Sequence, residues 1–150
     1  MKTKIISKIL LGLGLVFVLG SAITQVHGDN PPSFSVVTIH STGDVARGKT
    51  GSFVLTMNPS VMFGGTYINF KVSGTAIPGV DYVALISPAY IGQSGYATIL
   101  VHTLPNPRGS SDRQSYSVVV TLEAGAGYAL GQPSSAKMMI KPSNVLPCCQ

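Results

Sequence analysis

Histidine, serine and acidic side chains, which could serve in catalysis or metal binding, are dispersed along this chain. His40 and His102 have no Cys, His or carboxylate at the spacing of a metal site. Ser110 and Ser111 precede Asp112, but no Gly-x-Ser-x-Gly motif places a serine on a nucleophile elbow, and these residue types are common in loops. The sequence therefore predicts no catalytic residue, no bound cofactor and no enzyme activity.

Cys148 and Cys149 are the only cysteines, and they are adjacent. Consecutive Cα atoms lie about 3.8 Å apart, closer than the roughly 4.4 to 6.8 Å of a typical disulfide, so a bridge between the two would be strained. In an oxidising compartment they are candidates for intermolecular disulfides, in a covalent dimer or in attachment to another exported protein. The alternative is that the cysteines belong to a disordered C-terminal end that has no function and follows Pro142 and Pro147.

The net charge of +5 does not indicate nucleic-acid binding. Three of the ten basic residues lie within the first eight positions, and from Asp29 onward seven basic and five acidic residues leave a net charge of +2. The remaining basic residues form no run or stripe that could follow a phosphate backbone. They are Arg47, Lys49, Lys71, Arg108, Arg113, Lys137 and Lys141.

The first 28 residues have the pattern of a secretory signal peptide. Lys2, Lys4 and Lys8 form a basic head, and residues 9–23 follow without a charge. That apolar run is short beside the roughly 20 residues of a membrane span. We predict cleavage after Gly28, or alternatively after Ala22, with an uncleaved anchor as the competing interpretation. The domain is therefore expected to be secreted, periplasmic or on the cell surface, of a bacterium by the style of the leader.

Beyond the leader, apolar residues recur with a period of two and not 3.6, which is typical of half-buried strands. Turn-forming residues separate the runs at intervals that leave no room for crossover helices. The sequence predicts an all-β fold, a seven-stranded antiparallel immunoglobulin-like β-sandwich in residues 29–141, and a flexible tail at 142–150. The expected strands lie near residues 34–39, 52–57, 67–72, 81–86, 97–102, 116–122 and 136–141.

Residues 72–82 read Val-Ser-Gly-Thr-Ala-Ile-Pro-Gly-Val-Asp-Tyr, a strand end followed by Gly-Thr-Ala and then Gly-x-Asp-Tyr. With residues 45–48, 96–101 and 121–136, this stretch resembles the Calx-beta domain family. The resemblance covers nearly all of 34–140. It implies a seven-stranded sandwich and a family often found in extracellular, adhesive or calcium-sensing proteins.

The resemblance also implies where calcium would bind, at one end of the sandwich. Only Asp81, in Gly-x-Asp-Tyr, matches an acidic position of the family; Arg47 stands where an acidic residue is expected, and the loop at 104–113 holds one carboxylate, Asp112. Calcium takes about six to eight oxygen ligands, several of them usually carboxylates, and nearby cations oppose it. We therefore predict a degenerate member of the family without a metal site. Asp81, the weak candidate ligand, is expected to bond backbone N–H groups of the Pro78-Gly79 turn.

The function predicted from the sequence is an exported, non-enzymatic binding or structural module, such as a surface, adhesion or matrix component that contacts a protein or glycan. The alternative is a calcium-dependent binding or sensor domain that uses Asp81, Asp112, Asp44 and backbone carbonyls. Lys137 and Lys141, on the last expected strand, are typical of a protected sheet edge. An unprotected edge elsewhere would allow a partner to add a strand.

Overall fold

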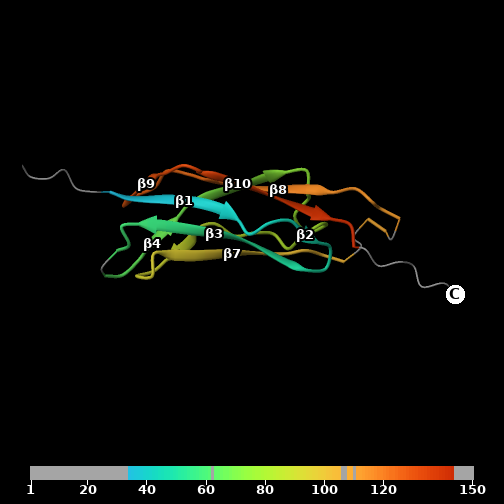
Figure 1. Ribbon diagram of the computed structural model, residues 1–150, viewed down its shortest axis with the longest axis horizontal. Helices are drawn as coiled ribbons and strands as arrows, with labels where there is room; N and C mark the ends of the chain where they lie inside the picture. The colour runs from blue at the N-terminus through green and yellow to red at the C-terminus, as the bar shows by residue number, and fades with distance from the viewer. Residues whose placement is uncertain (1–33, 62, 106–107, 110, 144–150) are drawn as a thin grey trace, which may run out of the picture. The chain divides into compact units, whose positions relative to one another are not determined.

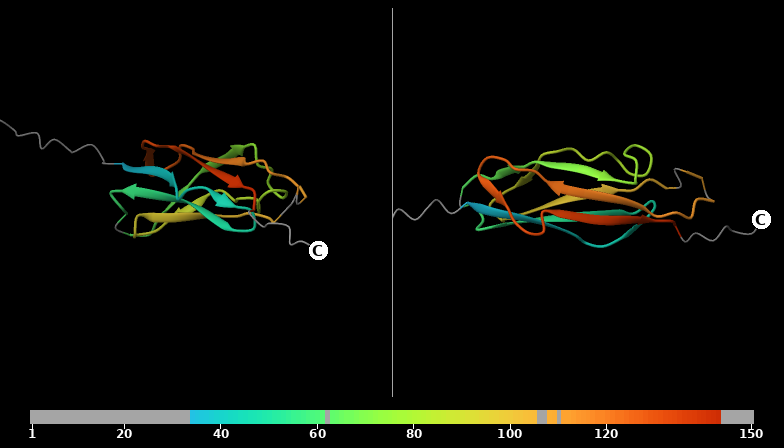
Figure 2. Two further views of the ribbon diagram at one scale, coloured as in Figure 1. Left: turned by 45° about the vertical axis from the view of Figure 1, so that its right-hand side comes forward. Right: turned by 90° about the horizontal axis from the view of Figure 1, so that it is seen from above.

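The strands of the domain form two main sheets that pack face to face, with a further pair of short strands beside them (Figures 1 and 2). A computed structural model describes residues 34–61, 63–105, 108–109 and 111–143, all within the compact unit Pro32–Gln150. No helix occurs among these residues. The all-β class is thus confirmed, as a sandwich-like arrangement.

Ten strands occur in the described residues. In chain order they are β1 (Ser35–Ser41), β2 (Val45–Ala46), β3 (Thr50–Asn58), β4 (Thr66–Ile68), β5 (Phe70–Gly74), β6 (Ala89–Ile91), β7 (Tyr96–His102), β8 (Tyr116–Leu122), β9 (Tyr128–Leu130) and β10 (Ser135–Lys141). One main sheet has the order β7-β3-β1-β9 and the other β2-β10-β8-β5, while β4 pairs with β6.

The long strands pair antiparallel, but two short strands do not. β3 lies between β1 and β7, and β8 lies between β5 and β10, all in antiparallel register. β9 runs parallel to β1, and β2 runs parallel to β10. The predicted arrangement of seven wholly antiparallel strands is therefore not confirmed.

The core comes from the alternating residues that the sequence pattern assigned to the inner faces. Phe53, Leu55 and Met57 of β3 are buried, and so are Ile99 and Val101 of β7. The facing sheet contributes Phe70 of β5, Val118, Val120 and Leu122 of β8, and Met138 and Ile140 of β10. Burial of these side chains, each worth about 1.5 to 3 kcal/mol, explains why a period of two was sufficient to locate the long strands.

The strand predicted at 81–86 is wrong. Tyr82 forms an isolated bridge with Thr103, and the Val83 N–H donates to the His102 carbonyl at 2.9 Å, but no strand continues from there. The segment instead crosses toward the other sheet, where the Ser87 hydroxyl accepts the Phe70 N–H at 3.0 Å. A segment that moves from one sheet to the other cannot stay paired with either edge.

The strand predicted at 67–72 is divided in two by a change of partner. Asn69 separates β4, which pairs with β6, from β5, which pairs with β8. The alternation of burial continues through Asn69, since Ile68 and Phe70 on either side of it are buried. Periodicity alone does not reveal such a division.

Three sequence predictions lie outside the described residues: the leader at 1–28, the greater part of the tail, and the pair Cys148 and Cys149. Within the described part of the chain, no helix has the length and apolar composition that a membrane span needs.

Candidate functional site

Asp81 lies at the centre of four charged side chains at one end of the sandwich, named here the ionic cluster: Arg47, Asp81, Arg108 and Asp112. Asp81 is fully buried. Its Oδ1 accepts Arg47 Nη1 at 3.3 Å and Arg108 Nε at 3.0 Å, while its Oδ2 accepts Arg108 Nη2 at 2.8 Å. Arg108 thus makes the two-point contact that a guanidinium offers a carboxylate.

The turn after β5 positions the Asp81 carboxylate. The Ile77 backbone N–H donates to Asp81 Oδ2 at 2.8 Å, and the Asp81 backbone N–H donates to the Ile77 carbonyl at 2.8 Å. On the other side, the Leu104 N–H donates to the Asp81 carbonyl at 2.9 Å. The geometry agrees with the predicted bond from Asp81 to its turn, and adds two guanidinium partners that the sequence pattern did not reveal.

Arg47 is buried between the two carboxylates. Its side chain is 2% exposed, and its Nη2 donates to Asp112 Oδ2 at 2.9 Å. The guanidinium carbons of Arg47 and Arg108 lie 5.1 and 4.3 Å from the ring centroid of Tyr116, within the range of cation–π contacts. Arg47 Nε is buried and has no hydrogen-bond partner among the described residues.

The cluster balances two positive charges against two negative ones. Hydrogen bonding from Arg108, together with the Ile77 N–H and Arg47, holds the pKa of Asp81 below its ordinary value of 3.8 despite the opposing effect of burial. The same contact with Asp81 raises the pKa of Arg108. Burial, with the nearby charge of Asp81, raises the pKa of Tyr82. The arrangement can fasten loops together at this end of the domain.

The three candidate calcium ligands do not come together in the structure. Arg47 lies between Asp112 and Asp81 and pairs with both carboxylates. Asp44 lies elsewhere, accepting Lys141 Nζ at 2.8 Å and the Met139 N–H at 3.1 Å. In the described residues, no group of three His, Cys, Asp or Glu side chains is placed to hold a metal ion.

The lowered pKa of Asp81 predicts a loss of stability in acid. A carboxyl whose pKa is lower in the folded than in the unfolded chain stabilises the fold above the unfolded value, and that contribution disappears as pH falls toward the folded value. We expect urea-unfolding free energies to be constant above about pH 5 and to fall below about pH 4. The Asp81→Asn variant should show a shallower fall, and an equally steep fall in this variant would assign the acid sensitivity to other carboxyls such as Asp44, whose pKa is also lowered by Lys141.

Calcium is expected to leave the stability of the domain unchanged. An ion at Asp81 would have to displace Arg47 and Arg108, which occupy both carboxylate oxygens. Thermal melts in millimolar calcium and in chelator should therefore give the same midpoint. A midpoint that rises with calcium would reveal an ion site and favour the calcium-dependent sensor.

A second feature is a groove of about 390 Å³ between β7 and residues 83–90, which lie beside it; it is named here the β7 groove. Its volume is within the range of ligand sites. Several large apolar side chains around it are exposed to solvent. The exposed fraction is about half for Val83, Leu100 and Tyr90, and 86% for Ile86. Its lining consists of residues 83–86, Ala89, Tyr90, residues 97–100 and His102.

The Tyr90 ring at this groove contacts the Tyr67 ring and occupies space that a side chain at position 65 would need. Tyr90 lies opposite Tyr67 in the β4–β6 pair, with ring centroids 5.1 Å apart and a tilt of 54°. A side chain at Gly65 would overlap the Tyr90 hydroxyl. Exposed apolar side chains gathered around a concave site, with aromatic rings among them, are typical of contact surfaces.

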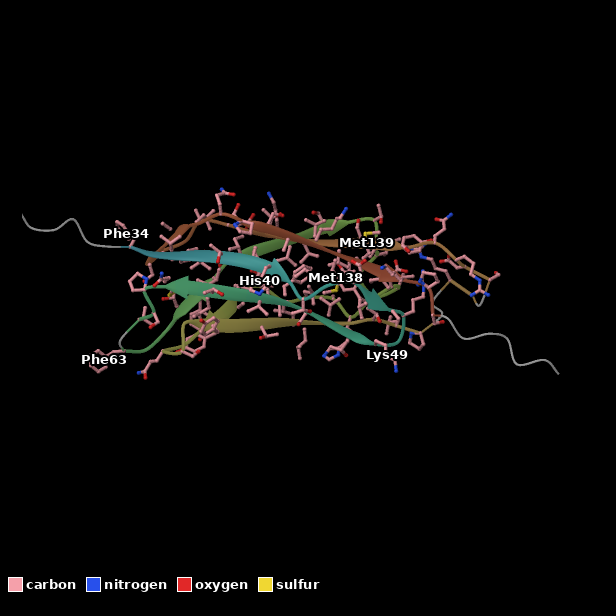
Figure 3. All side chains as sticks on the ribbon, viewed as in Figure 1. Phe34, His40, Lys49, Phe63, Met138 and Met139 are labelled. Atoms are coloured by element: carbon pink, nitrogen blue, oxygen red, sulfur yellow. The ribbon has the colours of Figure 1, made fainter. Side chains whose placement is uncertain are left out.

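His40 and His102, the two histidines of the described residues, form no side-chain hydrogen bond or ion pair with the ionic cluster. The His102 ring Nδ1 is 2.9 Å from the Thr50 hydroxyl, across the β3–β7 pair. His40 is on β1, in the middle of its sheet, and its side chain is exposed (Figure 3). Lys49, two residues after Arg47 in the chain, lies toward the opposite end of the domain from Phe34 and Phe63 (Figure 3).

Comparisons with known proteins add no family to these observations. No protein-family model matches the chain, and no curated protein matches it. The function must therefore be inferred from the two sites themselves.

Proposed function

We propose that this chain is an exported, non-enzymatic binding or structural module that acts by contact with a protein or a glycan. The observation that carries the proposal is the β7 groove, where Val83, Ile86, Tyr90 and Leu100 expose apolar surface around one hollow. Exposed apolar side chains that gather around one concave site are typical of interaction surfaces. The basic head and apolar run of the leader support export.

We assign the ionic cluster a structural role in this function. A charge-balanced set of side chains at the end of the sandwich fastens the β5 turn to Arg47 and Arg108. A rigid support lowers the entropy that a contact surface loses on binding. The β7 groove begins two residues after Asp81, at Val83, so the cluster fixes one end of the groove.

We also propose that the domain is an immunoglobulin-like sandwich of the Calx-beta family. This assignment is supported by the order of the six long strands, β7-β3-β1 in one sheet and β10-β8-β5 in the other, which corresponds to E-B-A and G-F-C of an immunoglobulin domain. Residues 72–82, which carry the resemblance, form the end of β5 and the turn that holds Asp81.

The proposal is tested with protein purified after a host has expressed and exported the full chain. The protein is applied to a glycan array and to a peptide library, as wild type and as the Ile86→Asp and Phe63→Asp variants. Both side chains are 86% exposed, but only Ile86 lines the groove. We expect a ligand that wild type and Phe63→Asp retain and that binds Ile86→Asp at least about tenfold more weakly.

Ligands that bind all three proteins equally would contradict the groove as the contact surface. The absence of any ligand in either collection would count against a protein or glycan contact. N-terminal sequencing of the same preparation tests export, with Asp29 expected as the first residue and an intact Met1 as the contrary result.

A further inference from the structure

Alternate backbone groups of β7 point away from the rest of its sheet. The Thr103 N–H donates to the Lys49 carbonyl and the Met57 N–H to the Gly95 carbonyl, so odd-numbered positions bond toward β3. The Val83 N–H reaches the His102 carbonyl from the other side. In an antiparallel pair these directions alternate, and therefore Tyr96, Thr98, Leu100 and His102 direct their backbone groups toward the β7 groove.

Two of these four residues are free to bond a further strand. The Ser94 hydroxyl is within 3.3 Å of the Tyr96 N–H, and Val83 occupies the His102 carbonyl. In the described part of the chain, the N–H and C=O groups of Thr98 and Leu100 have no hydrogen-bond partner. They form a row of two donors and two acceptors along the floor of the groove.

This edge also lacks the charged side chains that often protect a sheet edge. β7 has seven residues and none of them is Lys, Arg, Asp or Glu. The other edges of the main sheets, as far as the structure describes them, are short or charged: β2 has two residues, β9 has three, and β5 carries Lys71. A long, uncharged edge is a template for an added strand.

The lining of the groove selects the chemistry of what can enter. No Asp, Glu, Lys or Arg lines it, and a charged side chain buried there without a partner would be strongly disfavoured. Backbone groups at alternate positions require a partner whose own donors and acceptors have the spacing of a polypeptide, which a glycan does not have. Both observations favour an uncharged polypeptide.

We propose, on the basis of the contact function above, that β7 binds an extended, uncharged polypeptide segment as an added strand. The segment bonds the backbone groups of Thr98 and Leu100. Its alternate side chains lie against Leu85, Ala89 and Tyr90 in the groove. Affinity comes from the backbone bonds, and selection against charged segments comes from the apolar lining.

The test uses the exported protein labelled with ¹⁵N and two end-blocked peptides, one of four Thr-Val repeats and one of four Thr-Glu repeats. We expect the Thr-Val peptide to bind and to slow the exchange of the Thr98 and Leu100 amide protons, and the Thr-Glu peptide to bind at least about tenfold more weakly. Leu100→Lys and Thr98→Lys, which place a charge on exposed positions of the edge, should each weaken binding of the Thr-Val peptide at least about tenfold. Leu130→Lys, on the far edge strand β9, should not change it.

Three results would overturn the inference. Binding of the Thr-Val peptide without protection of the two amides would exclude strand addition. Sedimentation of the wild type as a dimer that Leu100→Lys dissociates, with neither peptide binding, would show that the edge pairs with a second copy of the chain and not with a separate segment. If no peptide binds while a glycan binds wild type and not Ile86→Asp, the contact function stands and the polypeptide assignment fails.

Discussion

Replacing Asp81 by alanine is expected to lower the free energy of unfolding by about 3 to 5 kcal/mol, the usual result of removing one partner from a buried ion pair. The Arg47 side chain, 2% exposed, would keep only Asp112 as a charged partner. Arg108 would lose its two-point contact, and the Ile77 N–H its acceptor. Urea unfolding at pH 7 measures the change.

Two comparisons separate the effect of the ionic cluster from a general effect of losing a carboxylate. Asp44→Ala breaks an ion pair whose side chains are 40% and 57% exposed, and such pairs contribute little. Adding Arg47→Met to Asp81→Ala should recover part of the loss, because the uncompensated buried charge is then absent. Equal losses for Asp81→Ala and Asp44→Ala would contradict the role assigned to the cluster.

Gly74→Ala is expected to destabilise the domain by about 3 kcal/mol or more. Gly74 ends β5 with φ +124°, a conformation that alanine adopts only with strain. A Cβ atom there would also overlap the backbone carbonyl of Ser117 on β8. That carbonyl accepts the Ala76 N–H at 2.9 Å, so moving it would disturb the turn that holds Asp81.

Gly43→Ala provides the matched control, since Gly43 has φ +120° and nothing within 4 Å of its Cβ position. It shares the backbone strain of Gly74→Ala without the overlap, and should cost about 1 kcal/mol. Urea unfolding of both variants isolates the steric part. Similar losses for the two variants would show that the Ser117 backbone can move aside without lowering the free energy of unfolding.

The long strands were predictable because each has one buried face. Phe53, Leu55 and Met57 are spaced by two and all buried, as are Val118 and Val120 of β8. Residues 83–86 lack this property, since Val83 and Ile86 are exposed. The apolar residues there belong to the surface of the domain and not to a strand. The short strands β2, β6 and β9 have too few residues for any period to be recognised.

The ionic cluster was only half predictable. Asp81 and its turn could be recognised from local sequence, but Arg47 and Arg108 lie 34 and 27 positions away, and local patterns do not report such pairs. From the sequence alone, Arg47 indicates a cation that opposes calcium, and Arg108 is one of several dispersed basic residues. Of the four members of the cluster, only Arg108 and Asp112 lie close together in the sequence, and the shortest ion pairs of Arg47 and Arg108 link more distant positions.

The β7 groove was not predictable from the sequence, because an open edge depends on which strands become neighbours. The alternating residues of β7 predict a half-buried strand wherever that strand lies in a sheet. Lys137, predicted to protect an edge, is exposed on β10, and β2 pairs only with the end of that strand, at Ile140 and Lys141. The strand expected at 81–86 would have covered β7, and its early departure after Val83 opens the groove.

The most direct test of this account is amide hydrogen exchange along β7 in the free protein. If the edge is open, Thr98 and Leu100 should exchange rapidly, whereas Ile99 and Val101, whose N–H groups point toward β3, should be strongly protected. Protection of Thr98 and Leu100 equal to that of Ile99 and Val101 would mean that the edge is already paired, and would contradict the contact surface proposed for this protein.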